Sequence, residues 1–409
     1  MDTRQHILMQ PHRNHQAGIS LIEILIGVTI GLIGILMMYQ LTENWSIRKR
    51  TTAAGSDAQA SGSIGSYRLT DDIRQAGYGF GTAGTKIGCS ISAYDDAGIS
   101  PRATVNLLSF LMVPVVIQNG TTGNPNGPDS LSIFYGNGTT LSSSHRYTDS
   151  TLTTKKTATQ GPRTGIHRGD VVIVSPDTAN CGLVRITDNT NSDGLTIEHA
   201  NANSTYTDET GAGNQTRYNN PAGYLGAIAP GSVGTIYNVG DSPKLNMWRV
   251  SGRVLQECNY LDADCLDPSV PWNNIAEGII DLQAQYGLDT DNNYIVDKWV
   301  DPDAPTTTLP GAVPLPGGVL WSRLRAVRVA LLARSQEYEK TAVTLTAPLT
   351  GWVDAANHNV PFTMYNVDGS PAVPDDTPND WRHYRYRLYT TTIPLRNMVW
   401  GTMPRGTGI

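Results

Sequence analysis

One carboxylate stands in the most apolar part of the chain. Residues 18–27 read Gly-Ile-Ser-Leu-Ile-Glu-Ile-Leu-Ile-Gly, and Glu23 is the only charged residue between Ile19 and Leu41. A charged side chain inside a hydrocarbon layer costs a few kcal/mol or more, so it usually has a partner there. A cut after Gly18 would create a new amine at Ile19, four residues before Glu23. We therefore expect this amine, from the same helix or from a neighbouring subunit, to pair with Glu23.

A second group of candidate residues lies in the acidic stretch 289–297, Asp-Thr-Asp-Asn-Asn-Tyr-Ile-Val-Asp. Oxygen donors occur at relative positions 1, 3, 5 and 9, as in calcium-binding loops, and a backbone carbonyl would supply position 7. The expected ligands are Asp289, Asp291, Asn293, the carbonyl of Ile295, and Asp297. Two positions depart from an EF-hand, because Tyr294 stands where glycine is usual and Val300 replaces the bidentate glutamate. The stretch predicts either a calcium site or a solvated Asp/Asn turn.

The four cysteines, Cys89, Cys181, Cys258 and Cys265, form no CxxC motif and no cluster with histidine. Disulfides in an oxidising compartment are therefore favoured over a zinc site or four buried thiols. Four cysteines allow three connectivities. The short spacing favours Cys258–Cys265, which leaves Cys89–Cys181 as a long-range pair.

The segment from Ile19 to Leu41 is long enough to cross a membrane. At about 1.5 Å per residue it reaches roughly 35 Å, against a hydrocarbon thickness of roughly 30 Å. The preceding residues 1–18 are polar and end in Ala17-Gly18. A secretory signal peptide would carry its cleavage site after the apolar segment, whereas here the candidate site precedes it. A cut after Gly18 would thus leave the apolar helix on the mature protein.

Small and apolar residues continue the helical pattern beyond the apolar segment. They recur at steps of three or four, which lays one stripe along a helix, at Ala54, Ala58, Ser61, Gly65, Leu69, Ile73 and Ala76. Gly77 and Gly79 are candidate stop signals. The alternative for residues 51–66 is a flexible Ser/Gly/Ala stalk.

The rest of the chain is rich in Gly, Thr, Ser and Asn and predicts short strands joined by turns. Strands are expected at 131–135, 170–175, 183–187, 195–199, 234–238, 247–255, 279–286, 324–333 and 384–394. The order of elements predicts an α+β fold, with a long N-terminal hydrophobic helix packed on a large, mostly antiparallel β-rich head.

The start of the chain resembles the class III signal of type IV prepilins and pseudopilins, because Gly18 precedes an apolar run with glutamate at its fifth position. The resemblance implies that prepilin peptidase cuts between Gly18 and Ile19, that Ile19 is N-methylated, and that Glu23 is the assembly glutamate. It also implies four regions: a cleaved leader at 1–18, a membrane or filament-core helix at 19–45, its periplasmic continuation at 46–77, and a head at 78–409. Many major pilins have a proline about twenty residues into the mature helix, where this chain has Gln40.

Several later segments sharpen the resemblance to the PilW family of minor pilins. They are the helix end at 69–78, the stretch Gly-Ile-Ile-Asp-Leu-Gln-Ala-Gln-Tyr-Gly at 278–287, Leu-Arg-Ala-Val-Arg-Val-Ala-Leu-Leu-Ala-Arg-Ser at 324–335, and Thr-Ile-Pro-Leu-Arg-Asn at 392–397. The resemblance implies a structural subunit that helps prime pilus assembly and sits at or near the pilus tip. Its implied partners are other minor and major pilins, prepilin peptidase, the inner-membrane assembly platform and the inner membrane. The head would lie in the periplasm and later on the cell-surface pilus. No cofactor is required, and calcium is the candidate metal.

Other classes of function are less well supported. No GxSxG elbow, HExxH motif or Walker loop is present, so we expect no enzyme, although a hydrolase with an unrecognised site stays an alternative. The net charge of −6 gives no overall attraction to nucleic acid. The alternating cations and aromatics at 381–389 suit base stacking, but a half-buried strand explains them better. A membrane-anchored adhesin or DNA receptor and a type II secretion minor pseudopilin are the remaining alternatives.

Overall fold

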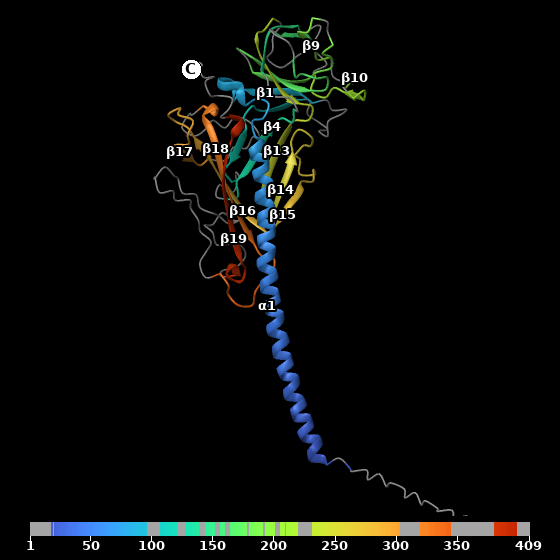
Figure 1. Cartoon of the computed structure of the whole chain (residues 1–409), viewed down its shortest axis with the longest axis vertical. Coiled ribbons are helices and arrows are strands. Elements are labelled where there is room, and N and C mark those ends of the chain that lie inside the picture. Colours follow the sequence, from blue (N-terminus) through green and yellow to red (C-terminus); the bar gives the residue numbers. More distant parts are fainter. Residues whose placement is uncertain are drawn as a thin grey trace, which may run out of the picture. The chain divides into compact units, whose positions relative to one another are not determined.

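The computed structural model describes residues 18, 20–95, 107–120, 127–138, 144–151, 156–159, 164–177, 180–190, 193–200, 205–208, 210–219, 231–302, 320–344 and 380–398 (Figure 1). The chain divides into two compact units, Met1–Ala53 and Ala54–Ile409. One helix, α1 (Leu21–Gln75), supplies residues to both. The expected leader residues 1–17 and Ile19 lie outside the described residues, whereas Gly18 and Glu23 lie within them.

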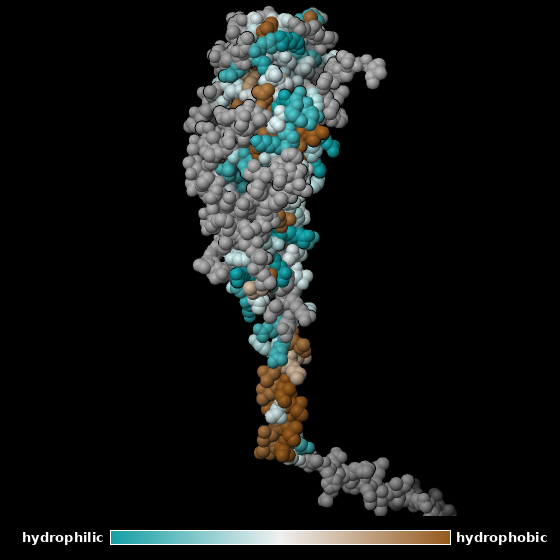
Figure 2. All heavy atoms as spheres, turned by 90° about the vertical axis from the view of Figure 1, so that its left-hand side faces the viewer, coloured by the Kyte–Doolittle hydropathy of each residue, from teal (hydrophilic) through white to brown (hydrophobic). Residues whose placement is uncertain are grey.

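The first part of α1 is an apolar segment whose described side chains are exposed. Residues Leu21–Glu43 have a mean hydropathy of 2.5 over the most apolar window, and none of that window is buried. Figure 2 shows apolar side chains covering the visible face of this segment. Large side chains such as Leu21 and Tyr39 are 77% and 68% exposed. Such a surface needs a membrane or neighbouring apolar helices to cover it.

The second part of α1 is amphipathic, and its buried stripe follows the expected pattern. Ala58, Leu69, Ile73 and Ala76 are buried. Gly62 is required for the close approach of a strand, because a Cβ there would lie 2.1 Å from the ring of Tyr389. The hydroxyl of Tyr389 donates to the carbonyl of Gln59 at 2.8 Å. This segment is therefore helical rather than the alternative Ser/Gly/Ala stalk.

Two mostly buried sheets lie against this part of α1 (Figure 1). A Cβ on Gly65 would contact Leu255 and Ala276 of the first sheet and Leu331 of the second. The first sheet has the order β15-β14-β13-β4-β3, with β3 (Val115–Gln118), β4 (Ser130–Tyr135), β13 (Lys244–Ser251), β14 (Val254–Asn259) and β15 (Asn273–Glu277). The second has the order β17-β16-β18-β19, with β16 (Ile279–Leu288), β17 (Lys298–Val300), β18 (Leu324–Arg334) and β19 (Tyr386–Pro394). All their described pairings are antiparallel.

A third sheet has the order β2-β1-β8-β7-β12-β5-β6-β9, with β1 (Ser90–Tyr94), β2 (Leu107–Leu111), β5 (Ser144–Thr151), β6 (Lys156–Thr159), β7 (Val171–Pro176), β8 (Cys181–Arg185), β9 (Thr196–Glu198) and β12 (Gly234–Gly240). Within it β1 and β8 pair in parallel. The short hairpin of β10 (Thr205–Thr207) and β11 (Gly213–Gln215) and the 3-10 helices η1 (Gly81–Lys86), η3 (Trp321–Arg323) and η4 (Asp380–His383) complete the described elements. The predicted α+β class is confirmed.

Two sequence expectations about strands differ from the structure, one by a whole turn and one in its first two residues. The single strand expected at 247–255 is a hairpin, because Gly252 and Arg253 have φ angles of 57° and 66° and form a two-residue turn between β13 and β14. The strand expected at 384–394 begins at Tyr386, and residues 380–383, which share the Arg/aromatic pattern, form η4 instead. In both cases the residue pattern continues across the real end of the strand, so the sequence alone does not show where the strand begins or ends.

A buried carboxylate joins α1 to the β4–β13 pair. Asp72 accepts hydrogen bonds from the hydroxyl of Tyr135 at 2.9 Å, from Nδ2 of Asn246 at 2.9 Å and from Nε1 of Trp248 at 2.8 Å. Asp72 is 8% exposed, and Asn246 and Trp248 are more deeply buried. Burial, together with the neighbouring Asp72 charge, raises the pKa of Tyr135. Each donor is thus paired inside a site that excludes most water.

The end of α1 is fixed by residues far along the chain. Gly77 has a φ of 80° and donates its N–H to the carbonyl of Phe134 at 2.9 Å. Nδ2 of Asn397 donates to the carbonyls of Gln75 and Ala76 at 3.0 and 3.1 Å. The two bonds from Asn397 satisfy carbonyls that a helix end leaves without intrahelical partners.

Replacing Asp72 by alanine should strongly destabilise the second unit. The change leaves three buried donors without their acceptor, so we expect a loss of about 3 kcal/mol in the free energy of unfolding. Thermal and denaturant unfolding of the full chain measures this. The control is Asp71→Ala one position away, where the partly exposed side chain bonds to Gln75 of its own helix and the change should be small. Equal stability of the two variants would contradict the role given to Asp72.

Candidate functional site

The first candidate site is the start of α1, where Glu23 has a local partner. Oε2 of Glu23 accepts the backbone N–H of Ser20 at 3.0 Å, and Oγ of Ser20 accepts the N–H of Ile22 at 3.4 Å. The glutamate bond is that of a capping box, with Ser20 at the N-cap and glutamate three residues on, but Oγ of Ser20 accepts from the second helical residue, Ile22, instead of from the third. The Ser-x-x-Glu spacing is a signal of this cap, but the sequence-based prediction for Glu23 considered only the amine at Ile19. Gly18 is exposed next to this cap.

The second candidate site is the acidic loop between β16 and β17. The register pairs Leu288 with Lys298, so residues 289–297 close a hairpin. Carboxylate oxygens of Asp289, Asp291 and Asp297 all lie within 4.8 Å of one another. Nδ2 of Asn293 reaches Asp291 at 2.9 Å. The structure therefore brings together the four side chains that the sequence spacing predicted as ligands. Ile295 could contribute only its backbone carbonyl, because its side chain is apolar and exposed.

The loop adopts its turn in spite of having tyrosine at the usual glycine position. Tyr294 has a φ of 69° and Asn292 one of 65°, both in the left-handed region. A non-glycine residue is uncommon there and costs of order 1 kcal/mol or more. The N–H groups of Asn293 and Tyr294 donate to Asp289 at 3.0 and 3.1 Å, which holds the turn in place. The departure from the EF-hand sequence therefore does not prevent the compact turn.

Arg325 is a partner of this loop that was not predicted from the sequence. Its Nη2 and Nε lie 2.9 and 3.0 Å from Oδ2 of Asp289, and its guanidinium lies 5.1 Å from the centre of the Tyr294 ring. The β16–β18 register places Leu324 opposite Leu288 and so brings Arg325 beside the loop. No sequence motif signals this contact, because it depends on the pairing of β16 with β18, and the loop, β17 and the residues up to Arg323 lie between these strands in the sequence.

The charge on Asp289 is stabilised in this position. Burial alone would raise its pKa, but hydrogen bonds from Tyr294 and Arg325 and the positive charge of Arg325 outweigh burial and hold the pKa below its ordinary value. At the other end of the loop, Oδ2 of Asp297 accepts the N–H groups of Thr290 and Asp291 at 2.7 and 3.2 Å. The arrangement can present several ionised oxygens to one hard cation, which would compete with these N–H donors.

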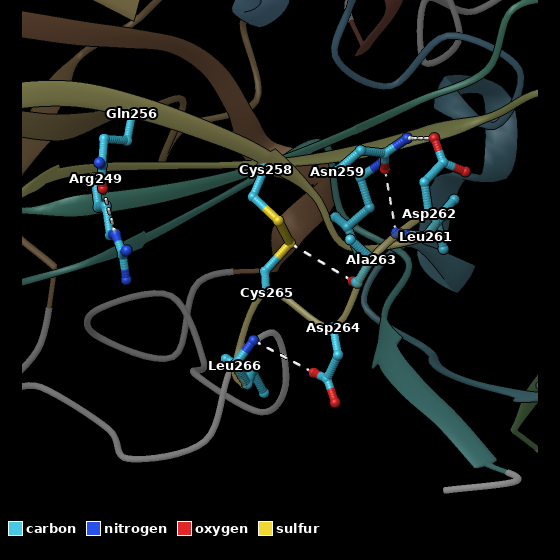
Figure 3. Close-up of a disulfide and its surroundings, with 11 residues drawn as sticks. Arg249, Gln256, Cys258, Asn259, Leu261, Asp262, Ala263, Asp264, Cys265 and Leu266 are labelled. Atoms are coloured by element: carbon cyan, nitrogen blue, oxygen red, sulfur yellow. Dashed lines mark hydrogen bonds between the residues drawn. A yellow bond between two sulfur atoms is a disulfide. The ribbon is translucent and has the colours of Figure 1, made fainter. Parts of the chain in front are cut away.

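Both disulfides join cysteines that were paired by their spacing in the sequence. Cys89 is joined to Cys181 in β8, and Cys258 in β14 is joined to Cys265, each with Cα atoms 6.0 Å apart. Figure 3 shows the Cys258–Cys265 loop, in which Oδ1 of Asn259 accepts the N–H of Leu261 at 3.1 Å. The short disulfide closes a turn at the end of β14, and the long one ties the segment after η1 to the third sheet.

Comparison with protein families matches two parts of the chain. Residues 258–397 match a family described as type IV pilus-assembly protein W, and residues 13–39 match the prokaryotic N-terminal methylation motif. No curated protein and no solved structure matches significantly. The first match contains the acidic loop, Arg325 and the helix-capping Asn397, and the second contains Gly18, Ile19 and Glu23. The third sheet lies outside both.

Replacing Arg325 by glutamine should cost stability in a pH-dependent way. The side chains of Arg325 and Asp289 are 3% and 0% exposed, and breaking such a pair costs about 3 kcal/mol. Because the folded-state pKa of Asp289 is lowered, its contribution is present above the unfolded value of about 3.9 and is lost as pH falls through the folded value. Denaturant unfolding between pH 7 and pH 3 measures the free energy of unfolding of the wild type and of Arg325→Gln. The difference between the two should be large at pH 7 and should decrease below about pH 4.

The matched control for this experiment is Arg146→Gln, which breaks an exposed ion pair with Asp177. Exposed ion pairs contribute little to the free energy of unfolding, so this variant should be about as stable as the wild type at each pH. If the free energy of unfolding of Arg325→Gln differs from that of the wild type by the same amount down to pH 3, the role of Asp289 as the ionised partner of Arg325 is contradicted.

Proposed function

Because the chain is a PilW-type pilin that carries the N-terminal methylation motif, we propose that prepilin peptidase cuts it between Gly18 and Ile19. The new amine of Ile19 is methylated, and the mature subunit enters a type IV pilus at or near its tip. There it helps to prime assembly. Its partners are other minor and major pilins and the assembly platform of the inner membrane.

The observation that carries this proposal is the position of Glu23 in the otherwise apolar and exposed first segment of α1. In the uncut chain the carboxylate caps the N–H of Ser20. A cut after Gly18 places a free amine next to this cap, so the carboxylate gains a charged partner from its own chain or from a neighbour. An ion pair makes burial of the helix in a membrane or filament core less costly than an isolated carboxylate would.

The arrangement of the second unit supports a structural rather than a purely anchoring role. Hydrogen bonds of Asp72, Tyr389 and Asn397 fix the amphipathic part of α1 to its sheets. A rigid attachment lets contacts of the head control where the helix docks. We propose that the head lies in the periplasm before assembly and on the cell-surface pilus afterwards.

The first test is mass spectrometry of the mature N-terminus from cells with and without prepilin peptidase. We expect a peptide that begins with N-methylated Ile19 only when the peptidase is present. Glu23→Ala should remove the subunit from purified pili, because its amine partner loses the counter-charge. The control is Glu43→Ala at the other end of the same apolar segment, which should still be incorporated.

The results distinguish the proposed function from its alternatives. Retention of residues 1–18 in both strains would exclude processing and leave a membrane-anchored binding module, such as an adhesin or DNA receptor. A processed subunit that appears with a secretion pseudopilus and not with pili would identify a type II secretion pseudopilin.

We also propose that the acidic loop binds calcium. Asp289, Asp291 and Asp297 converge, and ionised Asp289 is held in place by Arg325 and the backbone of the turn. Asn293 and the carbonyl of Ile295 would complete the set of oxygen ligands. The ion would tie β16 to β17 and so add rigidity to the sheet that contacts α1.

Calorimetric titration of the full chain with calcium chloride tests this site. We expect saturable uptake and a higher melting temperature, since a ligand that binds only the folded state stabilises it. Asp291→Ala should abolish both effects without unfolding the protein, because its side chain is exposed. Asp264→Ala, in the Cys258–Cys265 disulfide loop, should leave them intact. If Asp291→Ala changes neither calcium uptake nor melting temperature, the site is wrong.

A further inference from the structure

A polar cavity of about 430 Å³ opens where loops of the third sheet meet the β10–β11 hairpin. Its walls include the 167–170 loop before β7, the end of β8, and the turns that follow β4 and β12. The volume falls within the range of small-molecule sites, about 300–1,000 Å³. The cavity lies outside the residues matched by either family, and neither the acidic loop nor the start of α1 contributes to it.

Arg185 holds the walls of this cavity in place. Its Nη1 donates to the carbonyl of Gly169 at 2.6 Å, to the carbonyl of Asp241 at 3.1 Å and to the hydroxyl of Tyr206 at 3.4 Å. One guanidinium therefore links the loop before β7, the turn after β12 and strand β10. The ring of Tyr206 lies against Gly169, where a Cβ would come within 3.4 Å of it. A wall fixed in this way costs little ordering when a ligand binds.

The rim of the cavity is equally pre-organised. The N–H of Ser242 donates to Oδ1 of Asn137 at 2.9 Å, and Nδ2 of Asn137 donates to Asp241 at 2.6 Å. On the β10–β11 hairpin, Asp208 accepts hydrogen bonds from the N–H of Thr210 at 2.9 Å and from Nδ2 of Asn214 at 2.8 Å. The hydrogen bond from the hydroxyl of Thr210 is the main reason that the pKa of Asp208 lies below its ordinary value. The rim thus carries fixed acceptors.

The charges in the cavity are of both signs and interleaved. Arg168 and Arg185 line it together with the carboxylates of Asp208 and Asp241. Asp170 is buried, accepts the N–H of His167 at 2.8 Å and Nδ2 of Asn238 at 2.7 Å, and has a pKa raised by burial. A phosphate or a nucleic-acid strand would meet the aspartates, and a cation would meet the guanidiniums. The cavity therefore favours an uncharged ligand that both donates and accepts hydrogen bonds.

We propose that this cavity binds a neutral saccharide. Each sugar hydroxyl is a donor and an acceptor, which matches guanidinium donors and carboxylate acceptors that share one cavity. Tyr206 is only 8% exposed, so it forms part of the wall and leaves recognition to the hydrogen-bonding groups of the cavity. This site does not depend on processing or filament entry, so its test is separate from that of the proposed function.

The test uses the full chain in lipid nanodiscs, because detergents with sugar headgroups would compete for the cavity. Saturation-transfer NMR is recorded with glucose, galactose, mannose, N-acetylglucosamine and their disaccharides, and with a single-stranded oligonucleotide, and inorganic phosphate is added as a competitor. We expect transfer to at least one of the saccharides, none to the oligonucleotide, and no displacement by phosphate.

Two variants assign the signal to the cavity. Ser242→Trp fills the exposed rim without removing a side-chain contact that holds the fold, and Asp241→Ala removes a rim acceptor. Each should weaken saccharide binding at least tenfold. The matched control is Ser251→Trp, an exposed serine at the end of β13, which should bind as the wild type does.

Three results would overturn the proposal. They are no transfer to any saccharide of the panel, equal binding by Ser242→Trp and wild type, and binding of phosphate or the oligonucleotide that Ser242→Trp blocks. The unfolding temperature of each variant shows whether the fold is intact, and Ser242→Trp keeps the test decisive if Asp241→Ala fails to fold.

Discussion

The buried carboxylate of Asp72 decides how the amphipathic half of α1 meets the rest of the second unit. A charge in a site that excludes water is tolerated only when its oxygens are hydrogen-bonded. Tyr135, Asn246 and Trp248 meet this requirement from two adjacent strands. Sliding or rotating the helix would break all three bonds at once, whereas apolar contacts alone permit small shifts. The partly exposed Arg68–Glu257 pair, at 3.9 Å, could not impose such a register.

The remaining helix contacts are consistent with this fixed register. With Asp72 in place, the small residues of the buried stripe face strands β14, β15, β18 and β19, and Gly62 lies under the Tyr389 ring. The terminal carbonyls then lie within reach of Asn397, some 320 residues later in the sequence. The buried Asp129 acts similarly between sheets, because its carboxylate accepts the N–H of Ala284 at 2.7 Å and its own N–H donates to Leu282. Long-range polar contacts therefore position elements that apolar packing then stabilises.

The features that depend on local pattern could be predicted from the sequence. The apolar segment, the stripe from Ala58 to Ala76 and strands such as β4, β16 and β18 all follow from the spacing of their residues. The β13–β14 turn was missed because its two residues, Gly252 and Arg253, stand in a stretch of mixed apolar and polar residues that is typical of one continuous strand.

Other features depend on tertiary contacts. Asp72 resembles its more exposed neighbour Asp71 in sequence, and only the fold distinguishes them. In the acidic loop the carboxylates could be grouped by spacing, but the pairing with Arg325 required the β16–β18 register. The cavity could not be predicted at all, because its residues come from separate loops.

The regions matched to families and the cavity lie in different parts of the sequence, so one chain can combine pilus assembly with ligand binding. The methylation motif and the region matched to the PilW family contain the apolar helix start, the sheet of β16 to β19 and the cap on α1. The cavity is built from the third sheet and the β10–β11 hairpin. Among its described lining residues, those of the turn after β4 and of the Asp241-Ser242 turn before β13 connect it to the strands that hold Asp72. Substitutions in the hairpin or the 167–170 loop can therefore change what the cavity binds without altering the helix register. Assembly and ligand specificity can vary independently because no hydrogen bond of the Asp72 site involves a residue that lines the cavity within the described parts of the chain.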